Sequence, residues 1–239
     1  MRKIFQFFVF NLFFAGWISS LSAQSSEHQI KSALEFESKK MYFNADREYT
    51  QAITADPYND TLYLKRGAVR IKMKRYEEAI EDFQNYLKIN PMQAVGYLYL
   101  GKAKSMLLDY RNALKDLDQA VRLEPENADL YFFRGVVKMK MENSEGAISD
   151  FGQAIQNREK FIAAYLLRAR AHAEKEQVLA AIADYSQVIK LDMNQTEAWY
   201  NRAALYYQLN YLDDACRDWK IASIQGKKEA LKWINQLCQ

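Results

Sequence analysis

Residues 76–91, YEEAIEDFQNYLKINP, carry the pattern that decides the fold. Ala79, Phe83 and Tyr86 stand at positions i, i+4 and i+7, which lie on one face of an α-helix. Pro91 follows, and its fixed φ and missing N–H end a helix. The stretch therefore predicts an amphipathic helix that stops before residue 91.

The same order of residues returns in YRNALKDLDQAVRLEP, residues 110–125, after a step of 34 residues. Repeating that step along the chain finds alanine every time, at Ala45, Ala79, Ala113, Ala147, Ala181 and Ala215. Four places further on, a large apolar residue recurs at Tyr49, Phe83, Leu117, Phe151, Tyr185 and Trp219. A fixed period of this length is the signature of a repeat protein.

A second helix is predicted in the first half of each repeat. Small residues recur there at Ala33, Gly67, Gly101, Gly135, Ala169 and Ala203. Four places earlier the chain has an aromatic residue at Tyr63, Tyr97, Tyr131, Tyr165 and Trp199. Small residues let two helices approach closely, and the aromatic residue fills the space beside them. Each repeat is therefore expected to be a helix–turn–helix unit.

This pattern resembles the tetratricopeptide repeat family, which has 34-residue helical hairpins. The resemblance implies an all-α, right-handed α-solenoid of six repeats over residues 24–239, with a C-terminal capping helix over 228–239. The predicted repeats span residues 26–59, 60–93, 94–127, 128–161, 162–195 and 196–229. Gln29 replaces the first aromatic, and Glu159, Met193 and Lys227 replace proline in the last three repeats, which leaves the sharpness of those turns open.

The N-terminus has the features of an export signal. Arg2 and Lys3 precede an apolar run, IFQFFVFNLFFAGWI, and small residues follow it up to Ala23. The run is shorter than the roughly 20 residues of a spanning helix, which favours a cleaved signal peptide over residues 1–23 rather than a retained anchor. We therefore expect an exported protein, periplasmic or extracellular, without a membrane span after cleavage. Peripheral association with the cell envelope stays open.

Composition excludes several classes of function. The net charge is +3, and Arg2 and Lys3 account for two of the basic residues, so the mature chain is almost neutral and lacks the basic surface that nucleic acid requires. The two histidines, His28 and His172, are far apart in sequence and form no metal-ligand or catalytic set with the cysteines. No phosphate loop or nucleophile motif occurs. We predict no enzyme activity, no metal and no cofactor.

Arginines recur beside the small residue at Arg66, Arg134, Arg168 and Arg202. A phosphate-binding ladder is one interpretation. The favoured one is that each arginine lies along the neighbouring helix and pairs with an acid of the adjacent repeat.

The resemblance also indicates which side chains face the concave groove of the solenoid. These are the residue after each aromatic and those four and seven places further on. The groove prediction comprises Leu64, Leu98, Lys102, Phe132, Val136, Met139, Leu166, Arg170, Tyr200 and Tyr207. Its first series is apolar, and two interpretations stay open: packing between successive helices, or an exposed stripe that accepts a hydrophobic segment. Lys102 and Arg170 would then meet charged flanks or a terminal carboxylate.

The lysines and asparagines of the chaperone-tail clamp found in this family are missing from the matching positions. Cys216 and Cys238 are the only cysteines. In an exported chain they could form a disulfide between the last repeat and the capping helix, and two separate buried thiols are the alternative.

The sequence thus predicts a non-catalytic scaffold or adaptor that binds a peptide or helix of a partner protein in its groove. A structural component of an envelope complex, assembled through the edges or ends of the solenoid, is the alternative. The partner and the oligomeric state are left open by the sequence.

Overall fold

The computed structural model describes residues 26–238, which are helical except for short connections. The first helical segment covers residues 26–38. The elements that follow are α2 (Tyr42–Ala55), α3 (Asp60–Lys72), α4 (Tyr76–Ile89), α5 (Ala94–Met106), α6 (Tyr110–Leu123), α7 (Ala128–Lys140), α8 (Ser144–Asn157), α9 (Ile162–Glu174), α10 (Val178–Leu191), α11 (Thr196–Gln208), α12 (Leu212–Ile224) and α13 (Glu229–Leu237). No strand occurs over the described range. The predicted signal peptide lies outside it.

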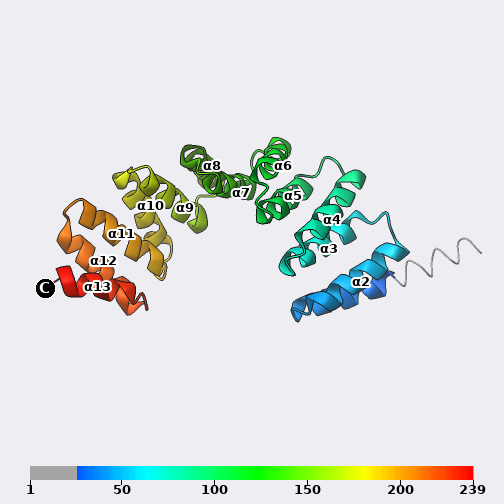
Figure 1. The fold of residues 1–239 in the computed structure, drawn as a ribbon, viewed down its shortest axis with the longest axis horizontal. Helices are drawn as coiled ribbons and strands as arrows, with labels where there is room; N and C mark the ends of the chain where they lie inside the picture. The colour runs from blue at the N-terminus through cyan, green and yellow to red at the C-terminus, as the bar shows by residue number, and fades with distance from the viewer. Residues whose placement is uncertain (1–25, 239) are drawn as a thin grey trace, which may run out of the picture. The chain divides into compact units, whose positions relative to one another are not determined.

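The chain divides into two compact units, one ending at Leu123 and the other beginning at Glu124. Each unit consists of paired helices, such as α3 with α4 in the first and α11 with α12 in the second (Figure 1). From α3 on, each predicted repeat contains one such pair. The all-α fold of repeated helical hairpins predicted from the sequence is confirmed.

Contact between a small residue and a large one holds each pair together. A Cβ atom added to Gly67 of α3 would lie 2.5 Å from Cε1 of Phe83 in α4, which is closer than atoms can pack. Gly101 stands in the same relation to Leu117, with 2.7 Å to its Cγ. The repeated alanines and their large partners are fully buried, since Ala79, Phe83 and Leu117 each have 0% exposure. Close approach therefore requires the small residue that the sequence repeats.

The turns inside the hairpins share one unusual backbone conformation. Within residues 26–238, six non-glycine residues have positive φ between 57° and 63°. They are spaced one repeat apart: Lys40, Lys74, Leu108, Glu142, Glu176 and Asn210. Such left-handed residues close the end of a helix, and glycine is the usual choice because Cβ makes the conformation costly. Here each turn carries a side chain instead.

In the first five repeats the second helix ends two residues before the proline position, with or without proline there. Helix α4 ends at Ile89, two residues before Pro91, and α8 ends at Asn157, two residues before Glu159. Packing of the helix pair therefore sets the end of the helix, and proline only reinforces it.

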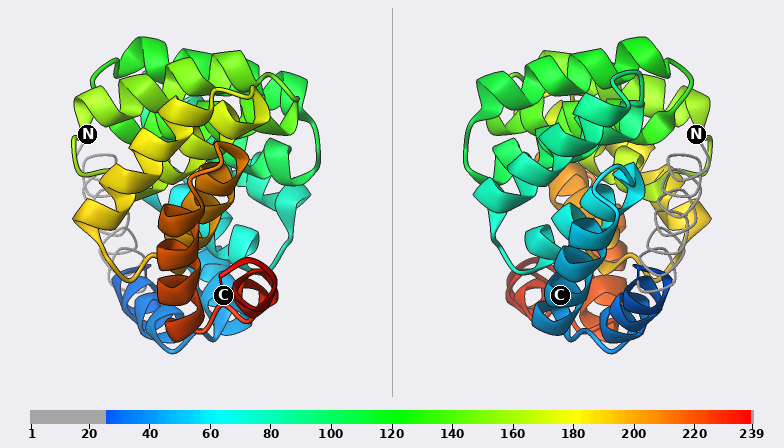
Figure 2. Two further views of the ribbon diagram at one scale, coloured as in Figure 1. Left: turned by 90° about the vertical axis from the view of Figure 1, so that its left-hand side faces the viewer. Right: turned by 90° about the vertical axis from the view of Figure 1, so that its right-hand side faces the viewer.

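The last element, α13, covers the end of the final repeat. Figure 2 shows it in red beside α12, and Ala230 at its start is completely buried. Its inner face carries Trp233, Ile234 and Leu237, which pack on a core that includes Trp219 of α12. The helix shields apolar surface that the final repeat would otherwise expose, as a terminal cap does in repeat proteins.

Candidate functional site: the groove positions

The first series of groove residues is half-buried. Leu64 and Leu98 come from α3 and α5 in the first unit, and the second unit contributes Phe132, Leu166 and Tyr200 from α7, α9 and α11. Core clusters contact four of these side chains, those of Leu64, Phe132, Leu166 and Tyr200. Leu64 packs beside the cluster that contains Phe83 and Leu100. The two interpretations of the stripe are therefore not exclusive, because the same side chains support the helix packing and keep part of their surface outside it.

Phe132 is surrounded by aromatic rings in the second unit. Its ring centroid lies 4.8 Å from that of Phe161, 5.3 Å from Phe133 and 5.9 Å from Phe151. Phe161 precedes α9, so a connection between two repeats contributes to the groove position. The sequence periodicity did not indicate this, because Phe161 stands outside every repeated position. One and two turns further along α7, Val136 and Met139 are partly exposed.

Lys102 and Arg170, the predicted charges of the groove, differ in their surroundings. Lys102 is partly buried, with Nζ 5.1 Å from the ring centroid of Tyr99. Arg170 is exposed and makes no ion pair with any residue of the described range 26–238. A charged guanidinium that is free of a carboxylate can bind one from a ligand.

Arg170 borders a pocket of about 290 Å³ formed by α9, α10 and α11. The pocket is lined by Arg170, Ala173, Glu174, Tyr185, Asn201, Ala204 and Leu205. Burial raises the pKa of Tyr185 to about 12, although nearby Arg170 and a hydrogen bond from Asn201 act in the opposite direction. The hydroxyl is therefore protonated near neutral pH. Guanidinium, hydroxyl and amide groups thus converge beside the small apolar surface of Ala173, Ala204 and Leu205.

Tyr185 and Asn201 were not among the groove residues predicted from the sequence. Tyr185 occupies the position of the large buried residue in its repeat, and only 2% of it is exposed. Asn201 directly follows the groove residue Tyr200. A polar residue at that place was a signal available in the sequence, but the position alone does not show that it meets the hydroxyl of another helix.

The last two groove residues are contacted by α13. Trp233 Nε1 donates a hydrogen bond to Tyr200 Oη at 3.3 Å. The ring of Tyr207 lies 6.4 Å from that of Trp233 and 5.9 Å from that of Trp219, while 43% of Tyr207 stays exposed. These two tyrosines therefore differ from the other groove positions because the capping helix packs against them.

The recurrent arginines form buried ion pairs, and the predicted partner was wrong. Each arginine pairs with an aspartate sixteen residues later in the second helix of its own repeat, not with an acid of the adjacent repeat. The pairs are Arg66–Asp82, Arg134–Asp150, Arg168–Asp184 and Arg202–Asp218. The two helices of one hairpin are antiparallel and closely packed, which brings these positions together. Because each guanidinium group is already paired with an aspartate, these arginines are structural and do not form a phosphate ladder.

The arginines do reach the preceding repeat through hydroxyl groups. Arg66 Nη1 lies 3.0 Å from Thr50 Oγ1, and Arg202 Nη1 lies 2.8 Å from Ser186 Oγ. His172 lies beside the Arg168–Asp184 pair of its own repeat, with Nε2 3.9 Å from Asp184 Oδ2 and Nδ1 2.6 Å from Gln177 Oε1. These contacts give His172 a packing role.

The two cysteines are joined in the structure. Cys216 of α12 and Cys238, which follows α13, form a disulfide with their Cα atoms 5.5 Å apart. Over residues 26–238, no group of three or more histidine, cysteine, aspartate or glutamate side chains could hold a metal ion. No helix of that range is long and apolar enough to cross a membrane.

Comparison with known families identifies the repeats. Models described as tetratricopeptide repeat match residues 61–91 and 98–160, and a model described as TPR repeat matches residues 169–210. Together with the helical hairpins, these matches show that the chain belongs to the tetratricopeptide repeat family. No curated protein matches the chain.

Solved structures with a similar fold are other proteins of this kind. A tetratricopeptide repeat protein from Parabacteroides merdae ATCC 43184 is 19% identical, with a TM-score of 0.67 over 90% of this chain and 98% of its own. YrrB, described as a TPR protein with an unusual peptide-binding site, is 20% identical, with a TM-score of 0.65 over 78% of this chain and 97% of its own. MamA is 23% identical, with a TM-score of 0.63 over 73% of this chain and 96% of its own. At these identities the likeness concerns the fold.

Proposed function

We propose that this protein is an exported, non-catalytic scaffold that binds a hydrophobic segment of a partner protein. The segment lies along the groove positions, which are on the first helix of each repeat. The observation that carries the proposal is the partly exposed first series of groove residues, in which Leu166 precedes Arg170 and its polar pocket by one helical turn. The family and the peptide-binding site named for YrrB support binding of a protein or peptide. The disulfide supports export, because such bonds persist in oxidising compartments.

The pocket also defines the chemistry of the preferred segment. Arg170 supplies a positive charge without an internal partner, and the neutral Tyr185 hydroxyl and Asn201 amide supply hydrogen bonds. Ala204 and Leu205 supply a shallow apolar surface. A segment with an acidic group next to hydrophobic residues fits these features better than a basic one does. Glu174 at the rim would oppose a second acid.

Site-specific photocrosslinking in intact cells tests this proposal. A photoreactive residue in place of Met139, which is partly exposed in the groove series, should capture a partner protein. The matched control is Leu179 of α10, which is 72% exposed but outside the groove positions, and it should capture none. Equal capture at both residues would contradict groove binding.

Charge reversal then tests the pocket with the partner so identified. Arg170→Glu should weaken its binding by about ten-fold, as expected for one charge-assisted contact. Arg217→Glu, an exposed arginine outside the groove positions, should leave binding unchanged. An Arg170→Glu variant that binds normally would remove the acidic group from the proposal.

The same crosslinking experiment tests the alternative in which partners meet the edges of the solenoid. Met106, Leu107 and Leu108 form an apolar turn between α5 and α6, with exposures of 55%, 37% and 71%. Capture at Leu108 together with none at Met139 would favour assembly through this edge.

A further inference from the structure

Helix α13 is held by one covalent bond and by aromatic packing. The disulfide joins Cys216 to Cys238, just after the end of the helix. Trp233 stacks on Trp219 of α12 with ring centroids 5.6 Å apart and an interplanar angle of 13°. At its other end, α13 is tethered to α12 by the short backbone connection between them. The bond therefore fixes the end of the helix that would otherwise be free to move.

The packed position of α13 occupies two groove residues. Trp233 contacts both Tyr200 and Tyr207, and Lys227, just before α13, lies 5.1 Å from the ring centroid of Tyr200. Lys227 Nζ is also 2.5 Å from Glu197 Oε1. If α13 left this position, the aromatic surface of the last repeat would be uncovered.

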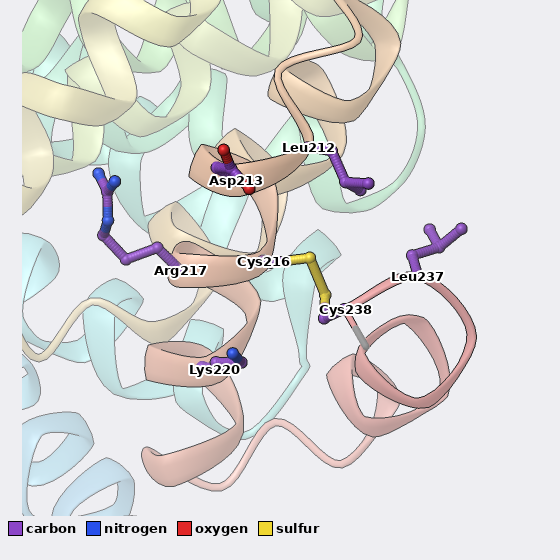
Figure 3. Close-up of a pocket in the computed structure, with 7 residues that line it drawn as sticks. All are labelled: Leu212, Asp213, Cys216, Arg217, Lys220, Leu237 and Cys238. Carbon is purple, nitrogen blue, oxygen red and sulfur yellow. A yellow bond between two sulfur atoms is a disulfide. The ribbon is translucent and has the colours of Figure 1, made fainter.

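A pocket of about 310 Å³ lies beside the disulfide and is lined in part by both cysteines. Figure 3 shows the bond between α12 and the chain that follows α13, with Leu212 and Leu237 on one side. Asp213, Arg217 and Lys220 come from successive turns of α12 and complete the lining. Arg217 is paired with Asp214, with Nη1 2.9 Å from Oδ1. Lys220 is exposed and makes no ion pair within residues 26–238, so it is the lining cation that can attract an anionic reagent such as a thiolate, against the opposing charge of Asp213.

We propose that this pocket is a thiol–disulfide exchange site and that the Cys216–Cys238 bond is a reducible latch on α13. The incoming thiolate attacks Sγ of Cys238, which belongs to a partly exposed residue, whereas Cys216 is only 8% exposed. The S–S bond breaks and its electron pair leaves with Cys216 as a thiolate. A second thiolate then attacks the mixed disulfide and releases Cys238, so two external thiols become one disulfide while the protein gains two thiols.

Reduction would loosen α13 because the helix is short. It has nine residues, and isolated helices of that length are not stable in water. Without the covalent bond, only the packing of its inner face would keep it on α12. The latch itself depends on the disulfide and this packing. One further step rests on the proposed function: once α13 has left, the uncovered Tyr200 and Tyr207 would extend the groove.

Limited proteolysis of the full-length mature protein tests the latch without any partner. Lys228 and Lys232 are exposed at α13, and Lys190 is exposed in α10. After reduction under native conditions and alkylation of both cysteines, trypsin should cut at Lys228 and Lys232 about ten-fold faster, while cleavage at Lys190 stays the same, as for local opening. The Cys238→Ser variant should show the fast cleavage without reductant.

Three results would overturn the latch. The first is a bond that resists reduction until the protein is denatured. The second is complete alkylation with no change at Lys228 and Lys232, which would make the disulfide dispensable for holding α13. The third is an equal rise at Lys190, which would mean that reduction unfolds the surrounding repeats. If the photoreactive residue at Met139 captured no partner, these three measurements would not change. The proposed function and the latch can therefore be refuted independently.

The charge of the exchange site is tested with three small thiols. After correction for thiolate fraction, 3-mercaptopropionate should reduce the bond faster than 2-mercaptoethanol, and cysteamine should be slowest. Lys220→Glu should reverse this order, whereas Lys190→Glu should keep it. Equal rates for all three thiols would contradict the role assigned to the pocket.

Discussion

The second and third repeats contain the same helix pair but different polar contacts within it. In the second repeat Asp82 receives Arg66, with Nη2 2.6 Å from Oδ1, and Arg70, with Nη1 2.9 Å from Oδ2. In the third repeat Asp116 receives only Lys104, with Nζ 2.6 Å from Oδ2. Leu100 occupies the place of Arg66 and is buried in the core cluster.

This difference separates what the hairpin requires from what it tolerates. Both repeats keep a glycine against a large apolar residue, Gly67 with Phe83 and Gly101 with Leu117. Only one keeps the arginine. Apolar packing therefore determines the pairing of the two helices, whereas the ion pair satisfies polar groups that happen to be buried there. Buried ion pairs often add little net stability, although breaking one is costly.

The largest expected effect comes from removing the acid in the second repeat. Asp82→Ala should lower the free energy of unfolding by about 3 kcal/mol, because the nearly buried Arg66 loses its carboxylate and Arg70 loses one carboxylate while keeping its pair with Asp46. Asp116→Ala should cost roughly 1–2 kcal/mol, because the flexible Lys104 can extend to water. Urea denaturation followed by circular dichroism measures both. Equal losses would show that the second arginine does not matter.

A smaller effect is expected when the second repeat is converted to the pattern of the third. Arg66→Leu places leucine where Leu100 stands and leaves Arg70 on Asp82. We expect a loss below about 1.5 kcal/mol, since an apolar residue can replace a buried charge when the remaining partner is satisfied. The same denaturation experiment applies. A loss as large as that of Asp82→Ala would refute the tolerance inferred from the third repeat.

The turns of the two repeats should both gain stability from glycine. Lys74 and Leu108 have φ of 62° and 63°, a conformation that costs an ordinary residue about 1–2 kcal/mol. Glycine avoids this cost but loses more entropy on folding, so Lys74→Gly and Leu108→Gly should each stabilise by roughly 0.5–1 kcal/mol. Thermal unfolding measures the gain. Gln84→Gly, at an exposed position inside α4, is the control and should destabilise.

The smallest effect concerns pH. Burial raises the pKa of Asp116, against the opposing effect of Lys104. The folded chain therefore holds this proton more tightly than the unfolded chain, so the contribution to stability is present below about pH 4 and is lost as pH rises through the folded pKa. An asparagine at position 116 does not titrate, so the Asp116→Asn variant lacks this pH-dependent contribution.

Wild type should therefore gain stability relative to Asp116→Asn as pH falls from 7 to 4, by less than about 1 kcal/mol. Urea denaturation at several pH values measures the difference, and Asp213→Asn, an exposed position, supplies the baseline. A difference that stays constant or moves the other way would contradict the effect of burial.

Much of the fold followed from the sequence because it depends on local rules. The period of 34 residues placed the helix pairs, and the apolar run after residue 228 predicted the capping helix that is observed as α13. The groove series was also defined by register, although its half-burial was not. Helical spacing shows which side of a helix a residue occupies, but not how far the neighbouring helix covers it.

Partners between helices were harder to infer. The recurrent arginines were expected to meet acids of the adjacent repeat, and the structure pairs them within their own repeat. The Arg170 pocket draws Tyr185 from α10 and Asn201 from α11, which no spacing within one helix relates. Contacts of Trp233 with Tyr200 and Tyr207 likewise depend on how α13 docks.

The sequence by itself determined the helical hairpin, its repetition and the side of each helix that is apolar, because these depend on periodicity, side-chain size and backbone geometry along the chain. Only the tertiary structure decided which charges are paired, which groove residues α13 covers and which groups converge at Arg170. Those outcomes depend on distances of a few ångströms between helices, and packing fixes such distances only when all the contacting side chains are in place.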